Sequence, residues 1–353
     1  MRKLRIGYWP LSKDLDAAGD RRRIVFWAKK RGHEIVTDLT QRIDVIVASE
    51  KTDFRSKIFN SKKIPLVFDL VDAYLCPKSP LDDLLRGVAK RVDGQISSGL
   101  LNFSGHIKNF CTLSDSVICS SPEQEEIIRA YNTNTHIILD SHEEIPFRDI
   151  NSLSQYSHKK KVTILWEGQP ATLSGFNQIR PIVKLLAKNY SLKFSFVTDK
   201  EYFRIMNRYL KRDTVDLIRL NSELDESQIA INHWSPINLV QEAERSFLAI
   251  IPTDLSTPLV RFKPENRLLI MWRLGLPCLT SASPSYIRVS NLAGTNAICD
   301  SPESWQAMML RMLNDPSLAK TEVLNGQAYV RENHNETTLL KKWDVAIESA
   351  MSR

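Results

Sequence analysis

The sequence predicts an α/β protein made of two Rossmann-like halves, each built on a doubly wound parallel sheet. In both halves, short runs rich in valine and isoleucine alternate with longer amphipathic segments, which is the pattern of parallel strands joined by crossover helices. A length of 353 residues also favours two domains over one. Between the halves, residues 151–161 read NSLSQYSHKKK, a polar and basic stretch typical of a linker. The carboxyl ends of the two sheets are expected to face across a cleft, where such sheets bind ligands.

The first half opens with a strand close to the N-terminus and closes with another near residue 140. The helical segment 18–31 ends at Gly32, and the segment 122–131 opens on a proline followed by acidic residues, so both have recognisable limits. A longer helical stretch spans about 82–113. The expected strands are 4–10, 33–36, 43–49, 64–71, 114–121 and 136–140.

The second half repeats this alternation. Strand-like runs occur at 161–168, 192–198, 247–253, 277–281 and 296–302, with further apolar segments at 215–221 and 229–235. The expected helices are 176–189, 237–246, an apolar helix that breaks at Gly275, 303–314 and a long amphipathic helix from about 335 onward.

Composition limits the cellular compartment. Hydrophobic residues make up 42% of the chain and charged residues 25%, which is ordinary for a globular protein in water. The five cysteines are odd in number and lack metal-ligand spacing, which favours buried free thiols in a reducing cytosol. No apolar stretch approaches the roughly 18 residues of a membrane span. The first strand starts too early to leave room for a signal peptide. We expect a cytoplasmic protein.

Positive charge is concentrated at the front of the chain. The net charge is +7, and residues 1–63 alone hold 16 Lys/Arg against 8 Asp/Glu. Solvated helix faces explain such a cluster. A patch of Arg21, Arg22, Lys29 and Lys30 that meets an anionic membrane surface or an anionic acceptor is the alternative. Nucleic acid is not expected as a partner, because no recognition motif accompanies the charge.

A second basic cluster, RFKPENR at 261–267, stands immediately before an apolar helix. A helix start already carries positive potential and favours acids such as Glu265, so helix capping does not explain why basic residues are concentrated there. The binding of a polyanion such as a diphosphate does explain them. Lys263 and Arg267 are four residues apart and are expected on one face of the helix start. A solvated helix end is the alternative. The expected diphosphate-binding residues are Lys263, Arg267, Asn266 and Arg261.

In their order, these segments resemble the GT-B glycosyltransferases of the group-1, family 4-like type over nearly the whole chain. LSDSVICSSPEQEEII resembles the end of their N-terminal half, VTILWEG the first strand of the donor domain, and AINHWSPINLVQEAERSFLAIIPT the nucleotide-side segment. KPENRLLIMWRLGLPCLTS is similar to the donor-phosphate helix, and ENHNETTLLKKW to the terminal helix that crosses back. The resemblance implies an acceptor-side domain at 1–155, with the helix at about 336–353 packed on it, and a donor domain at 156–335.

This resemblance implies a glycosyltransferase that moves a sugar from a nucleoside-diphosphate sugar to a glycan, lipid-linked or other acceptor, in surface polysaccharide or glycoconjugate synthesis. The nucleotide sugar is a substrate, and no cofactor is expected. No metal is expected either, because no Asp-x-Asp pair follows a strand in the donor half. The inner face of the membrane is a further expected location. A GT-B sugar-nucleotide epimerase and a non-catalytic partner of the same fold are the alternatives.

Two departures from the family pattern matter. Where many members carry the second of two glutamates in the donor-phosphate segment, this chain has Ile270. The arginine and lysine pair that often follows the first donor-domain strand is also missing, since EGQPATLSGFNQIR contains no lysine. These departures place more of the donor-binding task on Arg261, Lys263 and Arg267.

Candidate catalytic residues lie in VFDLVDAY, where Asp69 and Asp72 stand at the carboxyl end of a predicted central strand. A partly apolar setting there raises a carboxyl pKa toward that of a useful base, although a turn aspartate is an equally good interpretation of each. At the first strand–helix turn, the backbone at Gly19 can approach an acceptor or a phosphate closely. The remaining candidates are Gly168, Trp234 and Glu265 for the nucleotide or donor sugar, and Gly19, Asp20 and Arg21 for the acceptor side.

Overall fold

The structure, a computed structural model, describes residues 2–60, 64–96, 102–150, 161–186, 190–205 and 209–353. It divides into two compact units. The first comprises Met1–His142, Thr257–Pro264 and Asn335–Arg353, and the second comprises Glu143–Ser256 and Glu265–His334. The linker expected at 151–161 lies outside the described residues except for its last position.

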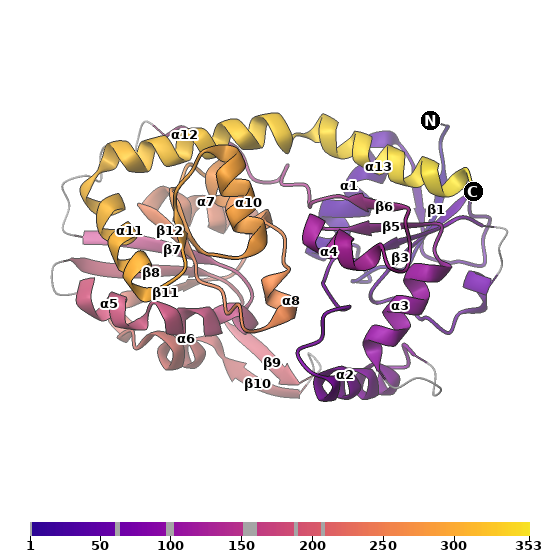
Figure 1. Cartoon of the computed structure of the whole chain (residues 1–353), viewed down its shortest axis with the longest axis horizontal. Helices are drawn as coiled ribbons and strands as arrows, with labels where there is room; N and C mark the ends of the chain where they lie inside the picture. The colour runs from indigo at the N-terminus through magenta and orange to yellow at the C-terminus, as the bar shows by residue number, and fades with distance from the viewer. Residues whose placement is uncertain (1, 61–63, 97–101, 151–160, 187–189, 206–208) are drawn as a thin grey trace. The chain divides into compact units, whose positions relative to one another are not determined.

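The first unit contains a six-stranded parallel sheet in the order β2-β1-β3-β4-β5-β6. Figure 1 labels β1, β3, β5 and β6 of this sheet. Alternate residues of its central strands enter two separate cores: Val45 and Val47 pack in one, and Ile46 and Ala48 in the other. The sheet is therefore covered on both faces, which explains why its strands are apolar throughout. The strands are β1 (Arg5–Tyr8), β2 (Glu34–Val36), β3 (Val45–Ser49), β4 (Leu66–Asp69), β5 (Ser116–Cys119) and β6 (Thr135–Ile137).

Helices from both ends of the chain cover this sheet. Trp27 and Trp343 bring α1 and α13 together in one core, with their rings stacked at 6.0 Å between centroids. Phe103 and Phe110 of α3 fill the other core. The helices of the first unit are η1 (Asp20–Ile24), α1 (Val25–Arg31), η2 (Lys57–Asn60), α2 (Pro80–Val92), α3 (Phe103–Leu113), α4 (Pro122–Ile128), α8 (Pro258–Arg261) and α13 (Glu336–Met351).

The second unit has its own six-stranded parallel sheet in the order β11-β8-β7-β12-β13-β14, together with an antiparallel hairpin of β9 (Glu201–Ile205) and β10 (Tyr209–Asp213). Val162, Ile164 and Trp166 of β7 alternate into a core rich in phenylalanine. The sheet strands are β7 (Lys161–Glu167), β8 (Ser191–Val197), β11 (Ile229–Asn232), β12 (Leu248–Ile251), β13 (Cys278–Ser281) and β14 (Ile298–Cys299). The helices are η4 (Pro170–Gln178), α5 (Arg180–Leu186), α6 (Thr214–Ser222), η5 (Glu226–Gln228), α7 (Pro236–Arg245), α9 (Asn266–Arg273), α10 (Pro284–Ala293), α11 (Pro302–Asn314) and α12 (Pro316–Asn333).

A repeated Ser-Pro dipeptide starts many of these helices. In each case the serine side-chain oxygen accepts a hydrogen bond from the backbone N–H three residues later, and proline occupies the first helical position, where no N–H is needed. This local signal fixes five helix starts on both units. The dipeptides begin at Ser79, Ser121, Ser235, Ser283 and Ser301.

The predicted fold class is confirmed, since each unit is a helix-covered parallel sheet. Two details differ from the expectation. The helical stretch 82–113 is two helices, because α2 ends at Val92, Asp93 caps it, and Gly94 follows with φ +75, a conformation that suits glycine. The apolar segment 215–221 is a helix, α6, which Asp213 caps by accepting from Val215 N–H.

Candidate functional site

The carboxyl edge of the first sheet begins with a loop organised by Asp20. This buried carboxylate accepts hydrogen bonds from the Tyr8 hydroxyl at 2.5 Å and from the backbone N–H groups of Leu11 and Ser12 at 2.9 Å each. Burial, with the adjacent Asp20 carboxylate, raises the pKa of Tyr8. Gly19 packs so closely that a Cβ there would lie 2.4 Å from the Leu11 side chain. The expected acceptor-side residues therefore lie together, with Asp20 holding the loop in shape.

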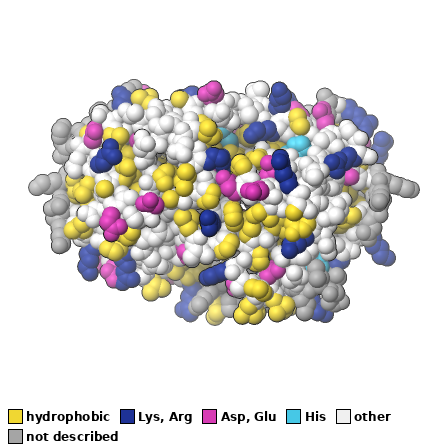
Figure 2. Space-filling model, in the orientation of Figure 1, with side chains coloured by type: hydrophobic (Ala, Val, Ile, Leu, Met, Phe, Trp, Pro, Cys, Tyr) yellow, Lys and Arg dark blue, Asp and Glu magenta, His cyan; other side chains and the backbone are white. Residues whose placement is uncertain are grey.

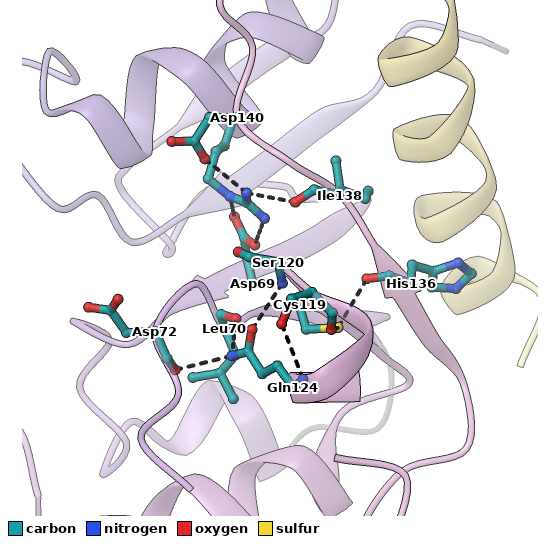
Figure 3. Close-up of polar contacts among 11 residues, drawn as sticks. Asp69, Leu70, Asp72, Cys119, Ser120, Gln124, His136, Ile138 and Asp140 are labelled. Atoms are coloured by element: carbon teal, nitrogen blue, oxygen red, sulfur yellow. Dashed lines mark hydrogen bonds and ion pairs between the residues drawn. The ribbon is translucent and has the colours of Figure 1, made fainter. Parts of the chain in front are cut away.

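Asp69, at the end of β4, is bound on both oxygens by Arg23. The Nε to Oδ2 distance is 2.9 Å and the Nη2 to Oδ1 distance is 2.6 Å, and both side chains are buried (Figure 3). Arg23 also donates to the Ile138 carbonyl and to Asp140. Burial alone would lower the pKa of Arg23, but the two carboxylates outweigh it and raise that pKa. A carboxylate occupied in this way is poorly suited to take a proton from a substrate.

Asp72 is placed differently, three residues farther along the same segment. Its backbone carbonyl accepts from Gln124 Nε2 at 3.1 Å, while its carboxylate points away from the Arg23 network (Figure 3). The Asp72 side chain keeps 28% of its surface exposed, and Lys263 Nζ lies 3.6 Å from Oδ1. Of the two predicted catalytic aspartates, Asp72 is the one that a substrate hydroxyl can reach.

Glu50 is a third carboxyl group at this edge, and sequence reasoning missed it. It directly follows β3, whose last residue Ser49 pairs in register with Asp69 of β4. Glu50 is only 7% exposed, and its Oε2 has no hydrogen-bond partner among the described residues. Burial, with repulsion from Asp72 and Asp69, raises the pKa of Glu50 to about 7. Such a group suits proton transfer at neutral pH. Its place directly after a buried strand is the signal that could have revealed it.

Part of the basic front is committed to internal contacts. Arg22 is buried, and Lys30 Nζ lies 2.8 Å from Glu336 Oε2 of α13. Arg31 likewise forms an ion pair with Asp344 of the same helix. The patch proposed from Arg21, Arg22, Lys29 and Lys30 is therefore wrong in part, because the fold takes Arg22 into the interior and neutralises Lys30.

In the second unit, three elements meet at the carboxyl end of β7. Glu167, the last residue of β7, accepts from Trp234 Nε1 at 2.8 Å, and its Oε2 lies 3.4 Å from Arg267 Nε. Arg267 belongs to α9, and Trp234 follows β11. The Arg267 guanidinium also lies 5.3 Å from the centre of the Trp166 ring and donates to the Glu167 carbonyl. A cation is thus fixed at the edge where parallel sheets bind ligands.

Gly168 makes this arrangement possible. Its φ of +155 is one that residues with a side chain rarely adopt. A Cβ at this position would lie 3.1 Å from Arg267 Nη2 and 3.2 Å from Thr172 Oγ1, closer than such contacts normally are. The glycine therefore lets the guanidinium approach the backbone at the turn after β7.

Around α9, the structure separates residues that the sequence placed together. The helix begins only at Asn266, so Lys263 and Arg267 do not share a helix face, and that expectation was wrong. Lys263 precedes Pro264, and a residue before proline is disfavoured in the helical conformation. Lys263 and the exposed Arg261 belong to the first unit, whereas Asn266 and Arg267 belong to the second.

Glu265 and Asn266 have contrasting surroundings at the start of α9. Glu265 is buried, and Arg288 of α10 reaches both of its oxygens at 3.2 Å. This pairing ties α9 to α10 and occupies the carboxylate. Asn266 Oδ1 is buried and has no hydrogen-bond partner among the described residues.

Within the described ranges, no group of three or more His, Cys, Asp or Glu is arranged to hold a metal ion. All five cysteines are free thiols, and burial raises the pKa of each of them. No helix in the described part of the chain is both long and apolar enough to cross a membrane.

Comparison by sequence finds no relative: no protein-family model matches the chain, and neither does any curated protein. Comparison by structure finds solved proteins of the GT-B fold. HepE from Anabaena, solved in complex with UDP and glucose, matches with a TM-score of 0.62 at 12% identity, over 98% of this chain and 100% of that one. Sucrose-phosphate synthase from Thermosynechococcus elongatus matches with 0.57 at 13% identity, over 96% and 79%.

TarM matches with a TM-score of 0.59 at 11% identity over 88% of this chain, which spans only 55% of the length of TarM. At identities this low, the likeness concerns the fold. The chain therefore has the GT-B fold that the order of its segments predicted.

Proposed function

We propose that the protein is a glycosyltransferase that moves a sugar from a nucleoside-diphosphate sugar to a glycan or lipid-linked acceptor. The observation that carries the proposal is the position of Arg267. Its guanidinium is fixed between Glu167 and Trp166 at the carboxyl edge of the second sheet, beside the start of an eight-residue helix. Breaking the sugar–phosphate bond leaves a diphosphate, and a preorganised cation stabilises the charge that develops on it.

Neighbouring groups support donor binding by the second unit. The unpartnered Asn266 Oδ1 can accept a hydrogen bond from a sugar hydroxyl. Trp234 is half-buried beside Glu167 and offers a ring to a nucleobase. HepE, whose fold this chain shares, was solved with UDP and glucose, which agrees with a nucleoside-diphosphate donor. In the proposal, Arg261 and Lys263 add positive charge for the diphosphate, and Glu265 supports the site through Arg288.

The first unit supplies the proposed base. The Asp72 carboxylate accepts the proton of the acceptor hydroxyl, whose oxygen then forms a bond to the anomeric carbon as the bond to the diphosphate breaks. Asp72 is the more accessible of the two aspartates, because its side chain is 28% exposed, whereas Asp69 is held by Arg23. Gly19, Asp20 and Arg21 shape the loop proposed to border the acceptor. Protein cations, rather than a metal ion, are proposed to offset the leaving charge.

The proposal extends to the setting of the enzyme. A glycan or lipid-linked acceptor fits a cytoplasmic enzyme of surface polysaccharide or glycoconjugate synthesis that works at the inner face of a membrane. TarM, one of the proteins that share this fold, was solved in complex with UDP and alpha-GlcNAc-glycerol.

The test is to incubate the protein with a panel of nucleoside-diphosphate sugars, with and without candidate acceptors, and to follow the products by mass spectrometry. Release of a nucleoside diphosphate together with a glycosylated acceptor, or with free sugar by slow hydrolysis, is the expected result. A sugar isomer without release would identify an epimerase instead. Neither binding nor turnover of any donor would make the chain a non-catalytic protein of this fold.

A further inference from the structure

Helix α2 of the first unit presents an apolar face to solvent. Among the described residues, no other helix exposes more than two large hydrophobic side chains, whereas α2 exposes five. Figure 2 shows hydrophobic side chains gathered at the lower edge of the molecule, over α2 as Figure 1 places it. The five side chains and their exposed fractions are Leu81 62%, Leu84 39%, Leu85 58%, Val88 44% and Val92 75%.

These five side chains form one stripe. At about 100° of rotation per residue, they fall within an arc of about 100° on the helix. The opposite face is polar or small and is the one that the protein buries. There Asp83 accepts hydrogen bonds from the backbone N–H and the hydroxyl of Ser104, Gly87 is buried, and the Lys90 ammonium lies 5.2 Å from the centre of the Phe103 ring.

The helix is therefore reversed relative to an ordinary surface helix, which turns its apolar stripe inward. A contiguous exposed apolar surface is typical of a site that binds a protein, a membrane or a ligand. The hydrogen bonds from Ser104 to Asp83 and the contact of Lys90 with the Phe103 ring hold α2 in this orientation, so the exposure follows from the packing of the unit.

The size of the stripe argues against a second copy of the chain as the occupant. Thirteen residues at 1.5 Å each give a length of about 20 Å, and five side chains exposed by 39% to 75% give the stripe roughly a few hundred Å² of accessible surface. A stable protein–protein interface needs about 800 Å² from each partner. A phospholipid surface needs much less, because an amphipathic helix binds there when its apolar face alone sinks into the boundary between headgroups and acyl chains.

Cations beside the stripe fit anionic headgroups. Lys78 precedes the helix and Arg91 lies in its last turn, and both are exposed. Arg55 also lies near the C-terminal end, 3.6 Å from a Cβ built on Gly94, but Asp53 already forms an ion pair with it at 2.8 Å. Asp82 and Asp93 are the exposed acids of the same segment. Basic side chains at the rim of an apolar helix face favour an anionic surface.

We propose that α2 binds the headgroup region of a phospholipid bilayer that contains anionic lipid, with Leu81, Leu85, Val88 and Val92 in contact with the acyl chains. Arg86 of α2 lies 5.0 Å from the centre of the Tyr74 ring, two residues after Asp72, so the bound helix stands beside the proposed base. The bilayer contact is independent of the proposed transferase activity. If the protein is a transferase, binding of α2 to a bilayer implies an acceptor carried on a lipid, and this consequence rests on the proposed function.

The test is co-sedimentation of the full chain with vesicles of phosphatidylcholine alone and of phosphatidylcholine mixed with phosphatidylglycerol. We expect binding to the mixed vesicles, and a loss of at least about tenfold in affinity in the triple variant Leu81→Gln, Leu85→Gln, Val92→Gln, as expected from the apolar area withdrawn from lipid. The matched control is Leu220→Gln with Leu292→Gln, which changes leucines of similar exposure on α6 and α10. The control should bind vesicles like the unaltered chain.

Three results would overturn the proposal: no binding of the unaltered chain to either vesicle type, equal binding by the triple variant, or an equal loss in the control. Gel filtration over a range of concentrations identifies the second copy as the occupant if a dimer is present and the triple variant abolishes it. Donor hydrolysis measured without vesicles reports separately on the transferase proposal. It should be unchanged in the triple variant, because α2 is not part of the donor site.

Discussion

Arg267 forms an ion pair with Glu167, with 3.4 Å between Nε and Oε2, and its guanidinium lies over the neighbouring Trp166 ring. The pair links the start of α9 to the end of β7. Because the guanidinium is held before any anion arrives, little side-chain entropy is lost when a diphosphate binds. Four predictions test this relationship and the carboxyl edge of the first sheet.

Replacing Arg267 by alanine should weaken the binding of a nucleoside diphosphate by about 10- to 100-fold, the value of one charge-assisted contact. The nucleoside alone should bind the variant as it binds the unaltered chain, because the lost contact is to phosphate. Calorimetry measures both affinities. Arg311→Ala, an exposed arginine on α11, is the matched control. Equal diphosphate affinity in a stably folded Arg267→Ala variant would remove the donor site from this edge.

Replacing Gly168 by alanine should disturb the same site without removing a charge. The added Cβ would lie 3.1 Å from Arg267 Nη2 at a backbone φ of +155, so the guanidinium or the turn must shift. We expect a lower melting temperature, by a few degrees, and a diphosphate affinity reduced roughly tenfold. The control is Gly32→Ala, at another positive φ but with no atom near the added Cβ. If both variants keep full affinity, the close approach at Gly168 has no part in donor binding.

The variants Asp69→Asn and Asp72→Asn should differ in what they lose: the first should lose stability, and the second should lose sugar-transfer activity. Asp69→Asn breaks a buried ion pair with Arg23, which costs on the order of 3–5 kcal/mol of unfolding free energy. Asp72→Asn should leave stability almost unchanged but lower the rate of sugar transfer roughly 100-fold, with donor binding retained. Chemical denaturation and transfer assays separate the two effects. Normal transfer by Asp72→Asn would show that this carboxylate does not accept the proton.

Glu50 should make stability depend on pH. Its folded pKa of about 7 lies above the ordinary value of 4.5, so the folded protein favours the neutral acid. The stability that this group contributes is complete below about pH 4.5 and is lost as pH rises through about 7, by roughly 3 kcal/mol at most. Relative to Glu50→Gln, the unaltered chain should therefore become less stable across that window. Parallel pH dependences in denaturant titrations of the two proteins would mean that Glu50 titrates normally.

Local signals in the sequence were enough to predict most of the fold. Alternating apolar runs predicted the strands. Ser-Pro dipeptides account for the starts of several helices, and a glycine with positive φ, such as Gly94 after α2, accounts for where a helix ends. The position of Arg267 near the carboxyl edge of a sheet also follows from chain order, because α9 starts between β12 and β13.

Pairings over long distances could not be predicted. Arg23 and Asp69 are 46 residues apart, and nothing local distinguishes Arg23 from Arg21 or Arg22. The same holds for Lys30 and Glu336, which are 306 residues apart. The periodicity of the sequence reveals the apolar stripe of α2 but does not say which face of the helix is buried. The usual rule, that a surface helix buries its apolar face, gives the wrong answer for α2. Glu50 was missed because its raised pKa comes from burial and from the carboxylates of Asp72 and Asp69, and neither cause can be read from the residues next to Glu50 in the sequence.

The final helix, α13, has a consequence for synthesis on the ribosome. Leu339, Trp343 and Ile347 complete the core around Trp27 and Ile6, although they are translated after the whole of the second unit. The second unit, by contrast, is complete once His334 has emerged. Chains grow from the N-terminus at about 5–20 residues per second, and domains fold as units. The first unit, most of which is made before the second, must therefore wait with an open core and complete its folding after the second unit.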